Sequence, residues 1–264
     1  MKSEKPLLEA LNGGADLAVD ADTYIFRAAW AASTPMDGPD GEVRICDADV
    51  AKAELEAMIR GLLRAAKKKS PIFCLTGRSV FRYKVAGNYK QKRKTKAKIQ
   101  GYTDLRKAVE TDGIIGFPSF FFDELEADDL VGLLGNGAFG SEPLMMASGD
   151  KDFKCVPGIH FDCRSGKRSR RSRDEAETAH RHQTLTGDTS DGYPGCPGVG
   201  PVKATEILTE SDSWDAVIKA FKRKGYTYED FLTQARLSRI LWSLHDFPLR
   251  TREVRLFKPN QKEL

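Results

Sequence analysis

Four short apolar runs constrain the fold more than any other feature of this sequence. They are bounded by turn residues and separated by helical-length stretches: Leu17 to Val19, Pro71 to Leu75, Pro143 to Ala147, and Ile159 to Phe161. Short strands that alternate with helical segments are typical of α/β proteins. The sequence therefore predicts an α/β fold with a mostly parallel central sheet flanked by helices.

Two helices are predicted from apolar residues at helical spacing. Residues 47–69 carry such a stripe and end in three lysines, which favours a helix because cations stabilise its C-terminus. Residues 123–135 place Ala127, Leu130, Val131 and Leu134 on one face, and their acids lie in the first turn. Both helices are expected to pack on the sheet.

The character of the chain changes after Gly187. The stretch GDTSDGYPGCPGVGP is rich in glycine and proline, and helical patterns follow in residues 202–208 and 214–221. We therefore expect two parts, an α/β domain in residues 1–186 and a helical C-terminal lobe in residues 187–264.

Composition excludes several classes of protein. No apolar run approaches the roughly 20 residues of a membrane span, and no secretory signal is recognisable, so we expect a cytoplasmic protein without a membrane partner. The five cysteines form no CxxC pair, which argues against a disulfide framework or a zinc knuckle. His180 and His182 would point apart on a helix, so they are not expected to share a metal.

The positive charge is concentrated in two clusters, although the formal net charge is only +4. Such clusters attract polyanions, but a solvated or disordered segment is an equally ordinary explanation for each alone. The first cluster is Lys90, Lys92, Arg93, Lys94, Lys96 and Lys98, and the second is Lys167, Arg168, Arg170, Arg171 and Arg173.

Acidic residues follow several of the predicted strands and turns. Because the carboxyl ends of parallel strands meet at one edge of a sheet, these acids are expected to converge. Two bare carboxylates about 4 Å apart repel by roughly 4 kcal/mol, so divalent cations would relieve the conflict, and oxygen ligands suit Mg²⁺ or Mn²⁺. Any one of them alone could instead stabilise a helix N-terminus. The acids are Asp20, Glu126, Asp128, Asp129, Asp150, Asp152, Asp188 and Asp191.

Taken together, these motifs resemble the 5′ nuclease (flap endonuclease) family, which includes stand-alone phage 5′→3′ exonucleases and the 5′ nuclease domain of bacterial DNA polymerase I. The resemblance spans about Leu17 to Leu208. The segments that resemble the family are, in order, LAVDAD, FRYKVAGNYKQKR, LEADD, SGDKDF and LTGDTSDGYPGCPGVGPVKA.

The resemblance implies a metal-dependent enzyme with a PIN-like nuclease domain and a helix-hairpin-helix-type lobe. It would cleave DNA at 5′ ends, flaps or junctions and leave 5′ phosphates. Two ions are expected, the first on Asp20, Glu126, Asp128 and Asp150, with Asp129 as a further candidate, and the second on Asp152, Asp188 and Asp191. Asp150 would bridge them.

The resemblance also assigns basic and glycine residues. Lys90 and Arg93 would contact the scissile phosphate. The expected DNA contacts are Arg82, Lys84, Lys90, Lys92, Arg93, Lys94, Lys96, Gly195, Gly198, Gly200 and Lys203. Tyr83 and Tyr89 would stack on bases or pack in the core. The glycine-rich turn could also hold a monovalent cation.

Other interpretations remain open. A non-catalytic, structure-specific DNA-binding protein and a ribonuclease of related fold are alternatives, and RNA:DNA hybrids are a further expected substrate. We expect a monomer.

One position departs from the family pattern. An aspartate expected at the end of the second strand is replaced by Leu75 or Thr76. Losing an anionic ligand should weaken metal binding, so a higher magnesium or manganese concentration is predicted, unless Asp22 or a water molecule substitutes.

Overall fold

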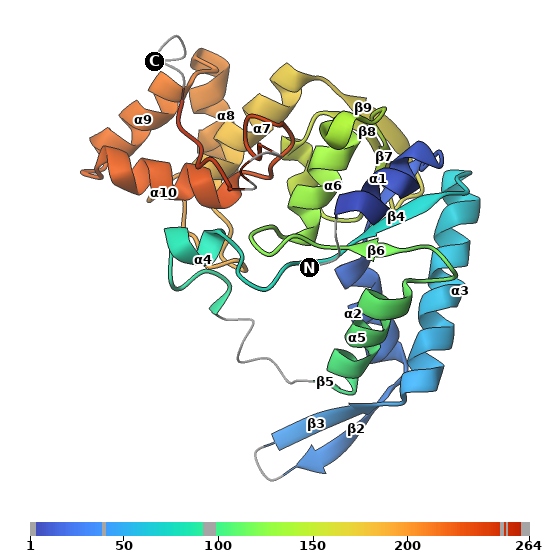
Figure 1. The fold of residues 1–264 in the computed structure, drawn as a ribbon. Coiled ribbons are helices and arrows are strands. Elements are labelled where there is room, and N and C mark those ends of the chain that lie inside the picture. Colours follow the sequence, from blue (N-terminus) through green and yellow to red (C-terminus); the bar gives the residue numbers. More distant parts are fainter. Residues whose placement is uncertain (1–3, 39–40, 92–98, 249–250, 252, 260–264) are drawn as a thin grey trace.

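The computed structural model describes residues 4–38, 41–91, 99–248, 251 and 253–259 (Figure 1). Its main sheet has six strands in the order β6-β4-β1-β7-β8-β9, parallel except for β9. The predicted α/β fold is confirmed. The strands are β1 (Leu17–Asp20), β4 (Pro71–Cys74), β6 (Ser119–Phe120), β7 (Met145–Ser148), β8 (Gly158–Asp162) and β9 (Arg168–Arg171).

Helices cover both faces of this sheet because successive strand residues point to opposite sides. In β1, Ala18 packs in the core shared with α6, whereas Leu17 and Val19 pack with α2 and α3. This explains why the strands read as continuous apolar runs. One face carries α1 (Glu4–Asn12) and α6 (Ala127–Gly135), and the other carries α2 (Ala21–Ala31), α3 (Ala48–Ala66) and α5 (Tyr102–Asp112).

The predicted helices exist with shifted ends. Asp47 caps α3 by accepting hydrogen bonds from the backbone N–H groups of Asp49 and Val50. The helix ends at Ala66 rather than within the lysines, because Lys67 adopts a left-handed conformation with φ 52°. At the other helix, Glu126 is the N-cap, so α6 starts at Ala127.

A small second sheet was not predicted. The hairpin of β2 (Ser33–Gly38) and β3 (Gly41–Cys46) pairs with β5 (Ile99–Gln100) and projects away from the main sheet (Figure 1). The short helix α4 (Arg82–Val85) follows β4 in the chain and contacts α10.

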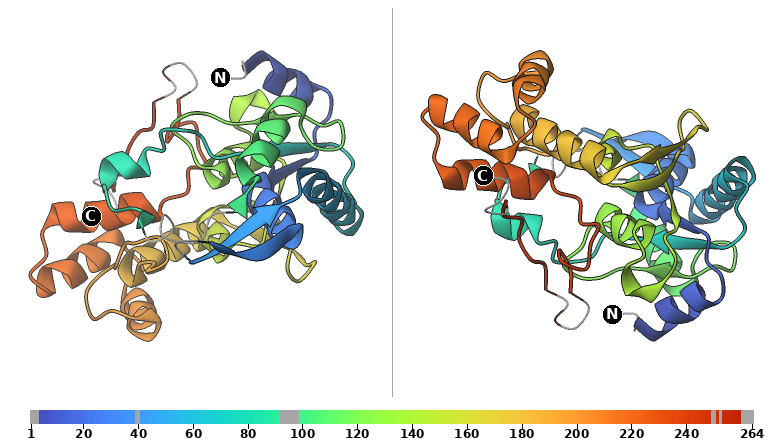
Figure 2. Two further views of the ribbon diagram at one scale, coloured as in Figure 1. Left: turned by 90° about the horizontal axis from the view of Figure 1, so that it is seen from below. Right: turned by 90° about the horizontal axis from the view of Figure 1, so that it is seen from above.

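The C-terminal helices lie on the side of the sheet away from α3 (Figure 2). They are α7 (Arg173–Thr186), α8 (Pro201–Glu210), α9 (Trp214–Arg223) and α10 (Tyr228–Ser238), and the short 3-10 helices η2 (Ala138–Gly140) and η3 (Lys151–Cys155) precede them. Trp214, Phe221 and Phe231 form the core of this lobe together with Leu185 from the end of α7. The helical lobe is thus confirmed, while its boundary at residue 187 stays a prediction. None of the helices in the described ranges is long and apolar enough to cross a membrane.

Two glycines close the turn between α7 and α8 by direct backbone contact. A Cβ atom on Gly195 would lie 2.4 Å from the amide nitrogen of Gly187 and 2.5 Å from the carbonyl oxygen of Leu185. Gly195 also has φ 69°, where side chains are strained. The turn therefore needs glycine for space as well as for backbone conformation.

Replacement of Gly195 by alanine is expected to lower the free energy of unfolding by more than about 3 kcal/mol, because strain and a backbone clash add. Gly166→Ala is the matched control: Gly166 has φ 68° with nothing within 4 Å of the added Cβ, so only about 1 kcal/mol of strain applies. Urea denaturation measures both. Equal losses would show that the close backbone approach is unimportant.

Candidate active site

The carboxyl edge of the main sheet collects the predicted acids. Asp20 is the last residue of β1, and Asp150 follows β7, the strand paired with β1. Burial, together with the nearby Asp22 and Asp150, raises the pKa of Asp20 to about 7. The predicted convergence therefore brings these carboxylates into electrostatic contact.

A second set of acids lies at the N-terminus of α6. Carboxylate oxygens of Glu126, Asp128 and Asp129 lie within 4.8 Å of one another. Burial and the other two carboxylates raise the pKa of Asp128 well above its usual range. Burial also acts on Glu126, but Arg82 and Lys90 outweigh it and lower the pKa of that residue.

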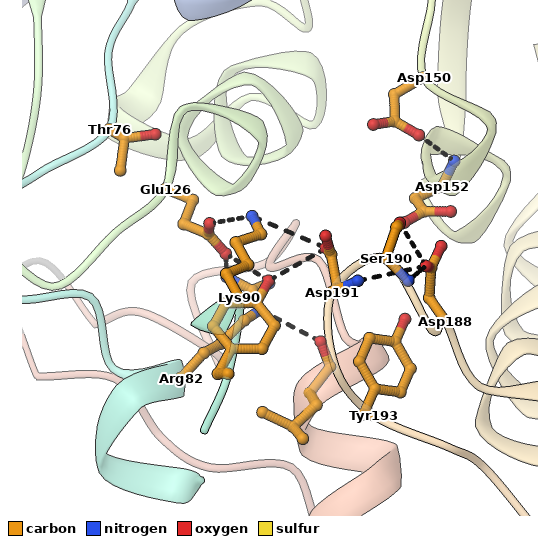
Figure 3. A network of polar contacts seen from close by, with 12 residues as sticks. Thr76, Arg82, Lys90, Glu126, Asp150, Asp152, Asp188, Ser190, Asp191 and Tyr193 are labelled. Atoms are coloured by element: carbon orange, nitrogen blue, oxygen red, sulfur yellow. Dashed lines mark hydrogen bonds and ion pairs between the residues drawn. The ribbon is translucent and has the colours of Figure 1, made fainter. Parts of the chain in front are cut away.

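The third set joins η3 to the turn after α7. Burial and the neighbouring Asp150 and Asp188 raise the pKa of Asp152 to about 6. Burial opposes ionisation of Asp188 as well, but hydrogen bonds from Ser190 and Lys151 lower its pKa to about 2. Figure 3 shows Asp150, Asp152 and Asp188 side by side, with Asp191 facing Glu126.

The residues present fit a divalent cation. Oδ1 of Asp20 and Oδ1 of Asp128 are buried and have no hydrogen-bond partner among the described residues. A buried oxygen without a partner is costly, and a metal ion would satisfy it. Clustered carboxylates with raised pKa values are the arrangement that a bound cation relieves.

Lys90 inserts its ammonium group between two of the acidic sets. It forms an ion pair with Glu126, and Nζ lies 3.7 Å from Oδ2 of Asp191 (Figure 3). Its backbone N–H donates to the carbonyl oxygen of Asp191 at 2.8 Å. Lys90 therefore lies in the acidic cluster, as expected for a group that could contact a scissile phosphate.

Arg82 and Asp129 form a buried ion pair that was not predicted. Arg82 is 1% exposed, and its Nη1 and Nη2 donate to both oxygens of Asp129 at 2.7 and 2.8 Å. Asp129 also accepts from the backbone N–H groups of Glu126 and Leu241, both at 3.0 Å. These four donors fill its acceptor sites. In the described structure Arg82 is buried and both oxygens of Asp129 are engaged by it, while the predicted roles of Arg82 in DNA contact and of Asp129 in metal binding stay predictions.

The remaining predicted DNA contacts divide into three groups. Lys84, Gly198, Gly200 and Lys203 are exposed, and Lys84 pairs with Glu124. Gly195 is buried and its N–H donates to Oε1 of Gln234 at 2.9 Å, so its predicted contact with phosphate stays a prediction. Lys92, Arg93, Lys94 and Lys96 lie outside the described residues.

Thr76 and Arg106 support the site in ways that were not predicted. The hydroxyl of Thr76 accepts from the N–H of Ala127 at 3.1 Å and thus caps α6. The backbone of Thr76 is held by Asp22 and Arg106, which are themselves an ion pair at 2.7 Å. Both oxygens of Asp22 are therefore engaged, and its substitution for the missing carboxylate stays a prediction.

Tyr89 also supports the site, and the sequence allows either base stacking or core packing for it. It is 3% exposed, and its hydroxyl donates to Oε2 of Glu126 at 3.0 Å. Tyr89 therefore packs in the core and supports Glu126. Tyr83 contacts it edge to face and is 41% exposed.

A family model described as the 5′-3′ exonuclease N-terminal resolvase-like domain matches residues 16–181, which is more than half of the chain and includes six of the eight predicted acids. The chain belongs to the 5′-3′ exonuclease family. As a member of it, the chain is a metal-dependent 5′→3′ exonuclease or flap endonuclease.

Individual relatives agree with this assignment. An exodeoxyribonuclease of Enterobacteria phage T3 is 31% identical over 89% of this chain and 80% of its own length. An exonuclease of Escherichia phage T7 is 27% identical over 98% of both chains. A phage T5 5′-exonuclease structure with bound divalent metal ions (zinc) has a TM-score of 0.64 at 18% identity, covers 85% of this chain and 89% of its own, and shows that the fold is shared.

Arg82→Met is expected to lower the free energy of unfolding by about 3–5 kcal/mol, because it leaves Asp129 buried without its cation and Glu126 with Lys90 alone. Lys84→Met, on the same short helix, should cost less than about 1 kcal/mol because its ion pair is exposed. Denaturant titration separates the two roles. A stable Arg82→Met protein with weakened DNA binding would instead support Arg82 as a DNA contact.

Proposed function

We propose that the chain hydrolyses phosphodiester bonds of DNA near 5′ ends, flaps or junctions, using two Mg²⁺ or Mn²⁺ ions and leaving 5′ phosphates. One observation carries the proposal: Asp20 at the end of β1 and Asp128 on α6 each have a buried carboxylate oxygen without a partner among the described residues, and Lys90 pairs with Glu126 beside Asp128. Because all these acids belong to one chain, we propose that a monomer is active.

The acids divide between two proposed cation positions. Asp20, Glu126, Asp128 and Asp150 would hold the first ion, and Asp152, Asp188 and Asp191 the second, with Asp150 between them. When bound, such ions activate a water molecule and neutralise the leaving oxygen. Lys90 would orient the scissile phosphate and stabilise its developing negative charge, because its ammonium group already lies between Glu126 and Asp191.

Duplex DNA has a candidate surface at the start of α8. Gly200 is the N-cap, Pro201 the first helical residue, and Lys203 is exposed beside them. A helix N-terminus presents free backbone N–H groups to phosphate. A phage T5 flap endonuclease of the same fold, with a TM-score of 0.62 at 17% identity, was crystallised as a complex with DNA and metal ions. We propose that Gly198, Gly200, Lys203 and Lys84 contact DNA.

Cleavage of 3′-labelled duplex and flap DNA tests the proposal. Asp150→Ala is expected to lower the rate on the order of 100-fold or more in Mg²⁺, because it removes the shared ligand, and chelator should abolish cleavage. Asp112→Asn, which changes an exposed acid on α5, is the control. RNA:DNA hybrid and all-RNA duplexes run in parallel identify the preferred substrate. Full activity of Asp150→Ala would remove that residue from the mechanism.

Thr76 should set the metal requirement. Thr76→Asp restores a carboxylate beside α6 that can still accept from Ala127, so the half-saturating Mg²⁺ concentration is expected to fall roughly tenfold. Thr76→Asn has similar size without the charge and should leave it unchanged. Calorimetric titration of Mg²⁺ and the rate as a function of Mg²⁺ both report this change. An equal response of the two variants would refute the electrostatic explanation.

A further inference from the structure

A cavity of about 270 Å³ lies between the start of α7 and the segment that follows α10. None of the predicted site residues lines it. Its charged walls come from Arg173 and Glu177 of α7, from Arg239 and Asp246, and from Arg255 and Lys258 near the end of the chain.

The two carboxylates of the cavity are already engaged. Nη1 of Arg239 lies 3.0 Å from Glu177, and Nη2 lies 3.4 Å from Asp246. Ser243 donates to the same oxygen of Asp246 at 2.9 Å. Arg239 therefore forms ion pairs with both acids, which leaves little negative charge to compensate the other cations of the wall.

Three cations of the wall have no carboxylate partner within the described residues. Arg173 lies over the ring of Trp242, 5.0 Å from its centroid, and neither Arg255 nor Lys258 forms an ion pair there. Four cations thus face two carboxylates, which leaves an excess of two positive charges.

Two hydrogen-bond donors without acceptors also suggest that negative charge is missing beside this cavity. Nε of Arg239 and Nε1 of Trp242 are both buried without an acceptor in the described part of the chain. Arg239 also lies over the ring of Trp242 at 5.0 Å. Buried donors normally find acceptors. Arg239 belongs to the cavity wall, and Trp242 lies directly behind it under Arg173 and Arg239, so hydrogen-bond donors without acceptors accompany the excess positive charge of the wall.

We propose that this cavity is a second anion site that binds a phosphate dianion, either free or as the terminal group of a nucleotide monoester. Guanidinium groups match the oxygens of phosphate in geometry and charge. The cavity has the volume of about nine liquid water molecules at ~30 Å³ each, enough for a phosphate group with a substituent.

The site is connected to the nuclease centre through Arg239. The carbonyl oxygen of Arg239 accepts a hydrogen bond from Nη2 of Arg82, whose Nη1 binds Glu126 at 2.8 Å. An anion held by the side chain of Arg239 therefore stabilises the segment that positions Arg82.

Calorimetric titration of the full chain in chloride buffer with chelator tests the site, because without metal ions the acidic cluster repels anions. Inorganic phosphate and thymidine 5′-monophosphate are the probes, and thymidine is the control for the base and sugar. The double variant Arg255→Gln/Lys258→Gln should raise the dissociation constant at least ~10-fold. Lys222→Gln/Arg223→Gln removes the same charge from exposed positions of α9 and should leave it unchanged.

Binding of both phosphates would identify the monoester group as the ligand, and binding of inorganic phosphate alone would identify the free ion; either supports the site. Three results would overturn it: no binding of either phosphate, equal binding of thymidine, or equal losses in the two double variants. Thermal unfolding under the same conditions confirms that the variants are folded.

Discussion

The buried pair of Arg82 and Asp129 determines how three parts of the molecule meet. Arg82 comes from α4, Asp129 from the first turn of α6, and the carbonyl oxygens of Leu237 and Arg239 from the end of α10, yet all share one set of hydrogen bonds. A buried guanidinium is tolerated only when its donors and its charge are satisfied, which here requires all three parts in place. The position of Glu126, and with it one side of the acidic cluster, depends on this arrangement.

The fold gathers more carboxylates at the active site than its lysines neutralise, and the chemistry of the site depends on this excess of negative charge. Strand ends and a helix N-terminus force carboxylates together, and burial raises the pKa values of Asp20, Asp128 and Asp152. Lysines offset only part of this charge: Lys90 pairs with Glu126, and Lys151 with Asp188 at 2.9 Å. The orphaned oxygens of Asp20 and Asp128 mark where the compensation is incomplete, so the fold itself creates the demand for cations.

The sequence predicted what depends on local pattern and failed where packing decides. Parallel topology follows from apolar runs, so the convergence of Asp20 and Asp150 could be anticipated. Asp128 and Asp129 are adjacent aspartates, but Asp128 keeps a buried oxygen without a partner among the described residues, whereas both oxygens of Asp129 accept from Arg82. Only the rotation along α6 and the partner from α4 separate them. Similarly, nothing in the sequence indicates that Gly195 is closed against Gly187 or that Thr76 caps α6.

The β2–β3–β5 sheet was not predicted because it, too, depends on long-range packing rather than on local sequence pattern. β3 pairs with only two residues of β5, across more than fifty intervening positions, and β2 contains a proline, so neither periodicity nor propensity marks it. Such strand pairing depends on tertiary contacts between segments far apart in the sequence, which local sequence patterns do not reveal.

The hydrogen bond from the backbone of Lys90 to the carbonyl of Asp191 has a mechanical consequence. It fastens the chain at the entrance to the basic segment onto the loop that carries Asp188 and Asp191. The backbone of Lys90 and the two carboxylates of that loop are therefore held in one arrangement by a main-chain contact, which a change of side chain at either position leaves in place.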